Sequence, residues 1–316
     1  MTDALLKAET GERLAIQQAE RSRGLWSDAW RRLRKNRAAV IGLMYILLMV
    51  LVALLAPVLA PHDPNAIPSH AIANTPPVWY DGGTWEFPLG TDSLARDELS
   101  RLIYGARISM IVGFVPTAIV VVIGVTYGLV SGWLGGRWDN ILMRLVDVVY
   151  AFPSLLLFII FQAAFREGWF GRSLGGLTLL FFAFAVTGWN GMARLTRGQT
   201  VSLRGQEFVE AARAVGNPGH RIIFRHILPN SLAPIIVAIS FAIPGYILAE
   251  ASLSFLGIGI RPPTASWGSM VFQSFPIVTY RPIFVIMPSL LIALVMIAFA
   301  FVGDGLRDAL DPQSTR

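Results

Sequence analysis

The residue types that carry catalytic chemistry are sparse in this chain of 316 residues. Its two lysines, Lys7 and Lys35, do not complete a Gly-x4-Gly pattern, so the chain has no phosphate-binding P-loop. The sequence contains no HExxH motif, and its lack of cysteine excludes disulfides and thiolate metal sites. We therefore expect no catalytic residue, cofactor or metal site in this chain, and any ATP that it uses must be bound by another chain.

Glu250 stands at the end of an apolar run that otherwise carries no charge. Ionisable residues within membrane spans are costly and often functional, so Glu250 is a candidate gate or pathway carboxylate. A position at a helix end or at the membrane interface is the simpler interpretation. Because ionisable residues are few in the apolar runs, the sequence gives little support to a transporter that relies on a proton relay.

The most distinctive polar stretch covers residues 194–229 and lies between two apolar runs. Residues at i, i+3, i+4 and i+7 predict one apolar side of a short helix, formed by Phe208, Ala211, Ala212 and Val215. We expect Gly216 to end this helix and Asn217-Pro218 to start another. Two short helices joined by a glycine elbow favour docking into a groove on another protein. The alternative is a hairpin on the membrane surface without a partner.

The elements that must position these residues are membrane helices. The chain is 54% hydrophobic and 15% charged, whereas soluble domains carry about 25% charged residues. The composition therefore predicts an all-α, polytopic membrane protein. We expect six transmembrane helices, with Pro153 kinking the third, over residues 38–60, 108–136, 148–165, 173–193, 227–249 and 283–303.

The segments outside these helices divide the chain further. We expect a polar tail over residues 1–37, a long loop with a short interfacial helix over 61–107, and a tail over 304–316. The core of five helices would then cover residues 108–303. Basic residues cluster beside the apolar runs, which is typical of membrane topology and not of a nucleic-acid-binding face.

The distribution of lysine and arginine predicts the orientation. Nineteen of the 26 basic residues fall in segments expected on one side of the membrane: nine in 1–37, two in 137–147, six in 194–229 and two in 304–316. Seven fall on the other side. Cytoplasmic segments are enriched in lysine and arginine, so both termini and the central polar stretch are predicted to be cytoplasmic.

Several motifs resemble one membrane-protein family. Glu210-Ala211-Ala212, Gly216 and Leu228-Pro229 have the spacing of the cytoplasmic loop of ABC-importer permeases, with His226 where that family has isoleucine. Residues 89–109, 250–270 and 303–312 are similar to the C-type permease subunit of dipeptide and oligopeptide ABC importers, although Ala95 stands where glycine is usual. The resemblance covers most of the chain from Arg31 onward.

This resemblance implies a type I ABC importer permease fold and a non-catalytic subunit in a bacterial or archaeal cell membrane. It implies a heterodimer with a homologous B-type permease, one or two ABC ATPase subunits that bind ATP and Mg, an extracytoplasmic solute-binding protein and a di- or oligopeptide substrate. The ATPase-coupling loop would contain Phe208, Glu210, Ala211, Ala212, Val215, Gly216, Leu228 and Pro229. Nickel or glutathione as the substrate, or an ion-coupled secondary transporter, are the alternatives.

The predicted topology can be tested with reporter fusions. A reporter joined after Gly205 is expected to be cytoplasmic, and one joined near Asp81 extracytoplasmic, because basic residues concentrate on the Gly205 side. The measurement is the activity of a compartment-specific reporter in intact cells. Finding both fusion points in the same compartment would rule out the six-helix arrangement.

Overall fold

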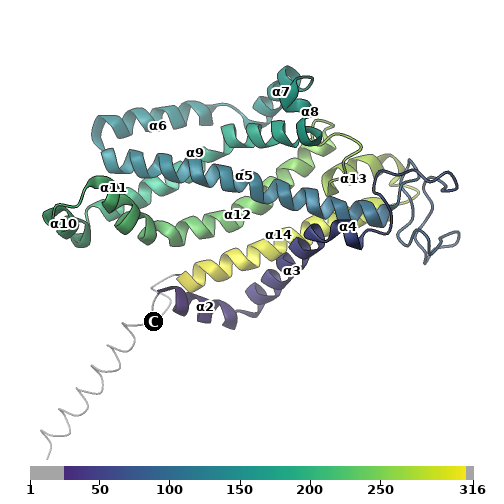
Figure 1. The fold of residues 1–316 in the computed structure, drawn as a ribbon, viewed down its shortest axis with the longest axis horizontal. Coiled ribbons are helices and arrows are strands. Elements are labelled where there is room, and N and C mark those ends of the chain that lie inside the picture. The colour runs from purple at the N-terminus through teal and green to yellow at the C-terminus, as the bar shows by residue number, and fades with distance from the viewer. Residues whose placement is uncertain (1–24, 311–316) are drawn as a thin grey trace, which may run out of the picture.

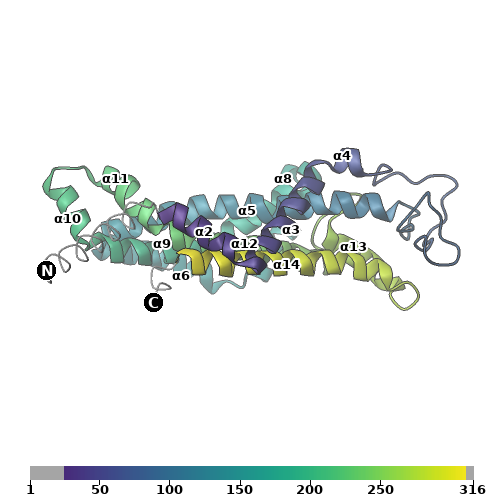
Figure 2. The ribbon, with the colours of Figure 1, turned by 90° about the horizontal axis from the view of Figure 1, so that it is seen from below.

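The computed structural model describes residues 25–310, which form helices and contain no β-strand. The α-helices are α2 Leu25–Lys35, α3 Arg37–Leu54, α4 Ala56–Leu59, α5 Glu98–Leu134, α6 Gly136–Ala151, α7 Ser154–Phe165, α8 Trp169–Arg172, α9 Leu177–Arg204, α10 Glu207–Ala214, α11 Gly219–Ile222, α12 Leu228–Phe255, α13 Trp267–Ser274 and α14 Ile283–Leu310. The long helices lie side by side in an elongated bundle (Figure 1). Figure 2 shows α10 and α11 at one end and the loop before α5 at the other.

Five helical segments within residues 25–310 are long and apolar enough to cross a membrane, namely Arg37–Leu54, Glu98–Leu134, Ser173–Arg204, Gly219–Phe255 and Ile283–Leu310. The pair α6 and α7 makes a sixth if it counts as one span, and its two halves are bent by 76° at the predicted Pro153 position. Five or six membrane-crossing segments therefore agree with the predicted all-α membrane protein.

Three expected boundaries are wrong. The interfacial helix expected near residues 89–109 is the first part of α5, which begins at Glu98 after the N-cap Asp97. The stretch 137–147, expected as a loop, lies in α6, and residues 194–204 of the expected polar loop lie in α9. Charged residues within a helix explain the last two errors, because they interrupt the apolar runs without interrupting the helix.

One of these charges shows how the helices accommodate them. Asp139 of α6 accepts two hydrogen bonds of 2.6 Å from the Arg197 guanidinium of α9 and a third of 2.6 Å from Ser131 of α5. A bidentate carboxylate–arginine pair with a third donor satisfies most of the polar atoms. The charges of α6 and α9 therefore join three helices instead of marking a loop.

A row of glycines brings α5 and α9 into close contact. Gly124, Gly128 and Gly132 recur at every fourth residue of α5 and face α9. A Cβ at position 128 would lie 2.4 Å from the carbonyl oxygen of Ala193. Small residues at such spacing let membrane helices approach through their backbones. This contact holds the centre of the bundle.

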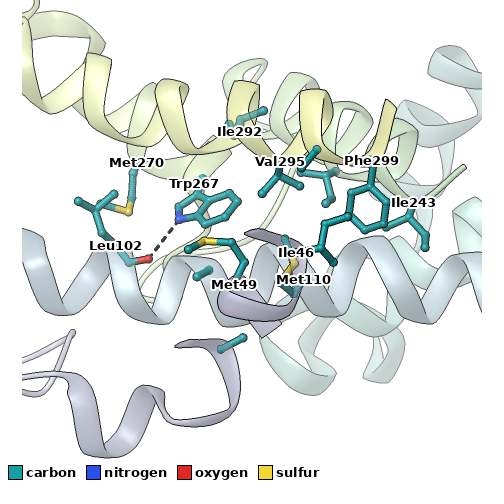
Figure 3. Close-up of a cluster of buried hydrophobic side chains, with 14 of the residues drawn as sticks. Ile46, Met49, Leu102, Met110, Ile243, Trp267, Met270, Ile292, Val295 and Phe299 are labelled. Carbon is teal, nitrogen blue, oxygen red and sulfur yellow. Dashed lines mark hydrogen bonds between the residues drawn. The ribbon is translucent and has the colours of Figure 1, made fainter. Parts of the chain in front are cut away.

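The largest buried cluster lies where α3, α5, α12, α13 and α14 meet (Figure 3). Its centre is the fully buried Trp267 of α13, whose indole N–H donates to the carbonyl of Leu102 at 3.1 Å. Met49, Val295 and Phe299 pack in the same cluster. The short helix α13 is thereby held inside the bundle next to α5 and α14.

Glu250 contributes to the position of α13. The residue is completely buried in α12, and its Oε1 accepts hydrogen bonds from Ser254 at 2.6 Å and Ser266 at 2.7 Å. Ser266 is the N-cap of α13. The other carboxylate oxygen has no hydrogen-bond partner in the described part of the chain. Glu250 is thus a buried acceptor that links α12 to the start of α13.

Substitutions at Glu250 separate this packing role from a role in transport. Glu250→Gln keeps an oxygen that accepts both serine hydroxyls, so we expect stability and uptake close to those of the wild type. Glu250→Leu leaves two buried hydroxyls without their acceptor, which costs about 1–3 kcal/mol for each unsatisfied group. We expect a lower melting temperature in detergent and weaker uptake. A Glu250→Gln protein that melts like the wild type but has lost uptake would instead support the gate or pathway interpretation.

Candidate functional site

The helices α10 and α11 form a compact unit at one end of the bundle. Val209 and Ala212 of α10 are buried and pack with Leu129 of α5 and with Ile222 and Ile227. These contacts join the unit to the ends of two long helices. The side of α10 that includes Val209 and Ala212 is therefore used within this chain.

The neighbouring side of α10 is exposed and largely apolar. Phe208 is 40% exposed and Val215 is 83% exposed, and Ala211 and Glu210 are also exposed. We call Phe208, Ala211 and Val215 the outer surface of α10. An isolated chain gains nothing from exposing large apolar side chains, so this surface is suited to contact with another protein.

Ala212 corrects one detail of the predicted apolar side. The sequence groups it with Phe208, Ala211 and Val215, but the structure turns it toward Val209 and the bundle. Val209 and Ala212 are three positions apart and therefore share one side of the helix, which the spacing from Phe208 to Ala212 did not reveal. A charge at Ala212 would disturb the internal packing, so Ala212 is a poor probe of an outer contact.

The turn after α10 depends on two adjacent residues. Gly216 has a φ of 83°, and a Cβ there would meet no atom within 4 Å, so the backbone angle and not the space requires glycine. The amide nitrogens of the backbone and the side chain of Asn217 donate to the carbonyl of Ala212 at 3.2 and 3.1 Å. Asn217 therefore closes the end of α10, and the predicted N-cap role is wrong, because α11 begins at Gly219 after Pro218.

Trp133, at the end of α5, packs against this unit. The Arg213 guanidinium of α10 lies 4.8 Å from the centre of the Trp133 ring. A Cβ on Gly219 would lie 3.0 Å from the indole nitrogen, so α11 also approaches the ring closely. Arg204 donates to the Trp133 carbonyl at 2.8 Å. The end of α9 and both short helices thus meet at one residue, Trp133.

No loop separates α11 from the following membrane helix. A single π-helical turn, Ile223–Ile227, connects α11 to α12, and Leu228-Pro229 begins α12 within this continuous run from Gly219 to Phe255. A displacement of α11 would therefore be carried directly into α12.

A group of buried charges that the sequence pattern did not predict lies at the other end of the bundle. Arg96 and Arg101 contact the Asp92 carboxylate at 2.6 and 3.3 Å, and both donate to the Gln273 side-chain oxygen. The group links the loop before α5 to α13. Two aspartates and two arginines within ten residues were the available signal. Among residues 25–310, no group of three His, Asp or Glu side chains is arranged to hold a metal ion.

The chain is similar to known membrane proteins over nearly its whole length. Residues 124–316 match the family described as "binding-protein-dependent transport system inner membrane component", and residues 24–77 match the "N-terminal TM domain of oligopeptide transport permease C". The oligopeptide transport system permease protein OppC of Bacillus subtilis (strain 168) is 39% identical over 298 residues, which cover 93% of this chain and 92% of that protein. The dipeptide transport system permease protein DppC of the same strain is 41% identical and covers 92% of this chain and 86% of that protein.

The fold is also similar to that of a solved permease. A chain of the inward-facing MetNI methionine ABC transporter superposes with a TM-score of 0.55 at 19% identity, over 67% of this chain and 96% of that chain. This likeness supports the type I ABC importer permease fold. The chain belongs to the family of inner membrane components of binding-protein-dependent transport systems.

Proposed function

We propose that this chain is the C-type permease subunit of an ABC importer for di- or oligopeptides. It forms the translocation pathway as a heterodimer with a homologous B-type permease. The observation that carries this proposal is the outer surface of α10, an exposed apolar contact site fixed to the end of two membrane helices. The identity of 39–41% to peptide permeases supports the choice of peptide as the substrate.

The energy source lies outside this chain. Without a P-loop the chain cannot hold ATP in the usual way, so one or two separate ATPase subunits bind ATP and Mg. An extracytoplasmic solute-binding protein delivers the peptide. The chain itself is a pathway subunit without catalysis.

The orientation follows from charge and from the arrangement of the helices. The six arginines within 194–229 support a cytoplasmic position for α10 by the positive-inside rule. Helix α2 and the end of α14 pack together and lie toward the same end as α10 (Figure 1). We therefore place both termini in the cytoplasm and the chain as a multi-pass protein in the inner membrane.

The coupling mechanism uses the rigidity of the α10–α11 unit. An ATPase subunit binds the outer surface of α10, and Val209, Ala212 and Ile227 keep the unit packed as one body. Packed elements move between discrete arrangements instead of deforming continuously. Because α11 continues into α12, movement of the ATPase shifts a membrane helix and changes access to the pathway.

Two variants on the outer surface test the contact. Phe208→Asp and Val215→Asp place a charge in an apolar interface, so we expect about tenfold or greater loss of ATPase binding, as for central interface residues. Peptide uptake should fall with it, while membrane levels of the chain stay normal. The measurements are a quantitative pull-down of the ATPase and an uptake assay.

Ile72→Asp is the matched control, because Ile72 is 75% exposed at the opposite end of the bundle. It should leave ATPase binding unchanged. Ala212→Asp should instead reduce the amount of folded chain. If Val215→Asp and Phe208→Asp both retain full ATPase binding, α10 is not the coupling element.

A further inference from the structure

A pocket lies at the break between α6 and α7. The two helices are bent by 76° there, and Figure 1 shows α7 turning away from the line of α6. The pocket has a volume of about 470 Å³ and is lined by Tyr150 and Ser154 on one side and by Thr187, Asn190 and Gly191 of α9 on the other. Non-helical backbone at membrane depth is tolerated where it is buried or lines a water-filled cavity.

Asn190 is the polar centre of this pocket. It lies thirteen residues from one end of α9 and fourteen from the other, and is 5% exposed. Its side-chain amide has no hydrogen-bond partner among residues 25–310, although Asn190 lines the pocket. The amide opens onto the pocket, so a polar ligand there can hydrogen-bond to it.

The neighbouring side chains are neutral hydrogen-bonding groups. Tyr150 presents a phenol hydroxyl, and Thr187 donates to the Ala183 carbonyl, which leaves its oxygen free to accept. One turn from Asn190 toward α10, Arg194 pairs with Asp147 at 2.5 Å and stacks on the Tyr150 ring at 4.7 Å. This charge pair joins α6 to α9 beside the pocket and fixes the phenol.

A larger pocket at the other end of the bundle is lined mainly by the loop after α4. It has a volume of about 540 Å³ and is lined in part by His62 and Asp63. His62 is bonded to Asp97, and Asp63 accepts from the backbone of Asn65. His62 and Asp63 are therefore already engaged within the chain, whereas the Asn190 amide has no such partner.

We propose that the pocket around Asn190 binds the main-chain amides of the transported peptide during passage, which rests on the proposed peptide-importer function. An asparagine amide both donates and accepts, as a peptide group does, so the pair is complementary. Amide recognition is independent of the peptide's side chains and suits an importer of varied peptides. Its position at the middle of α9, beside a broken helix, is where transporter substrate sites commonly occur.

Gly191 offers a test that spares the fold. A Cβ at position 191 meets no atom within 4 Å, so larger side chains extend into open space of the pocket. In the series Gly191→Ala, Gly191→Val and Gly191→Phe, we expect peptide uptake by the reconstituted complex to fall with side-chain volume, by about tenfold or more for phenylalanine. ATP hydrolysis stimulated by the binding protein should persist, because coupling is untouched.

Two further variants complete the design. Asn190→Leu removes both hydrogen-bonding groups and should raise the apparent KM for a labelled dipeptide about fivefold, the effect of one or two lost hydrogen bonds. Gly198→Phe is the control, because position 198 is also on α9 with no atom within 4 Å of a Cβ, and it lies outside the pocket. It should retain wild-type uptake.

The outcomes separate this inference from the proposed function. If the wild-type complex shows no ATP-dependent peptide uptake, the proposed function fails and this inference fails with it. If the wild type transports and Gly191→Phe and Asn190→Leu transport equally well, only this inference is overturned. It is also overturned if Gly191→Phe loses the partner permease in copurification, because the pocket is then a contact between subunits.

Discussion

The close backbone contact between α5 and α9 is the constraint on which the rest of the structure depends. Membrane helices gain little from apolar association with one another, so they need close packing through small residues. Gly128 and its neighbours provide that packing, and a single Cβ there would collide with the backbone of α9. The contact holds both sites in place, because α5 ends in Trp133 next to the α10–α11 unit and α9 carries Asn190 at its middle.

The two sites are linked by continuous elements instead of flexible loops. The outer surface of α10 lies on a packed unit, and α11 runs through a π-helical turn into α12. Helix α12 in turn holds α13 through Glu250 and Ser266. A force applied at α10 therefore reaches the opposite end of the bundle through helix backbone and buried hydrogen bonds. This arrangement suits a subunit that converts movement of an ATPase into opening of a pathway.

Apolar runs, turn residues and the Glu-Ala-Ala spacing predicted the membrane class, the break at Pro153 and the glycine turn at Gly216. Hydropathy could not predict α6, because Asp139 looks like a loop residue until Arg197 and Ser131 satisfy it. The direction of Ala212 was also hidden, since it depends on Leu129 and Ile222 from distant elements. The unpaired amide of Asn190 could be found only in the structure, because a single asparagine in an apolar run forms no sequence pattern. The features that the sequence did not predict are contacts between residues of different helices.

The most direct test of the central claim is peptide transport by purified components in proteoliposomes. Vesicles holding this chain with its partner permease and ATPase subunits, supplied with the binding protein and a labelled dipeptide, should accumulate the peptide only when ATP is present on the α10 side. Collapsing ion gradients should not change the rate. Accumulation by vesicles that hold this chain alone, driven by a proton or sodium gradient without ATP, would contradict the account and indicate a secondary transporter.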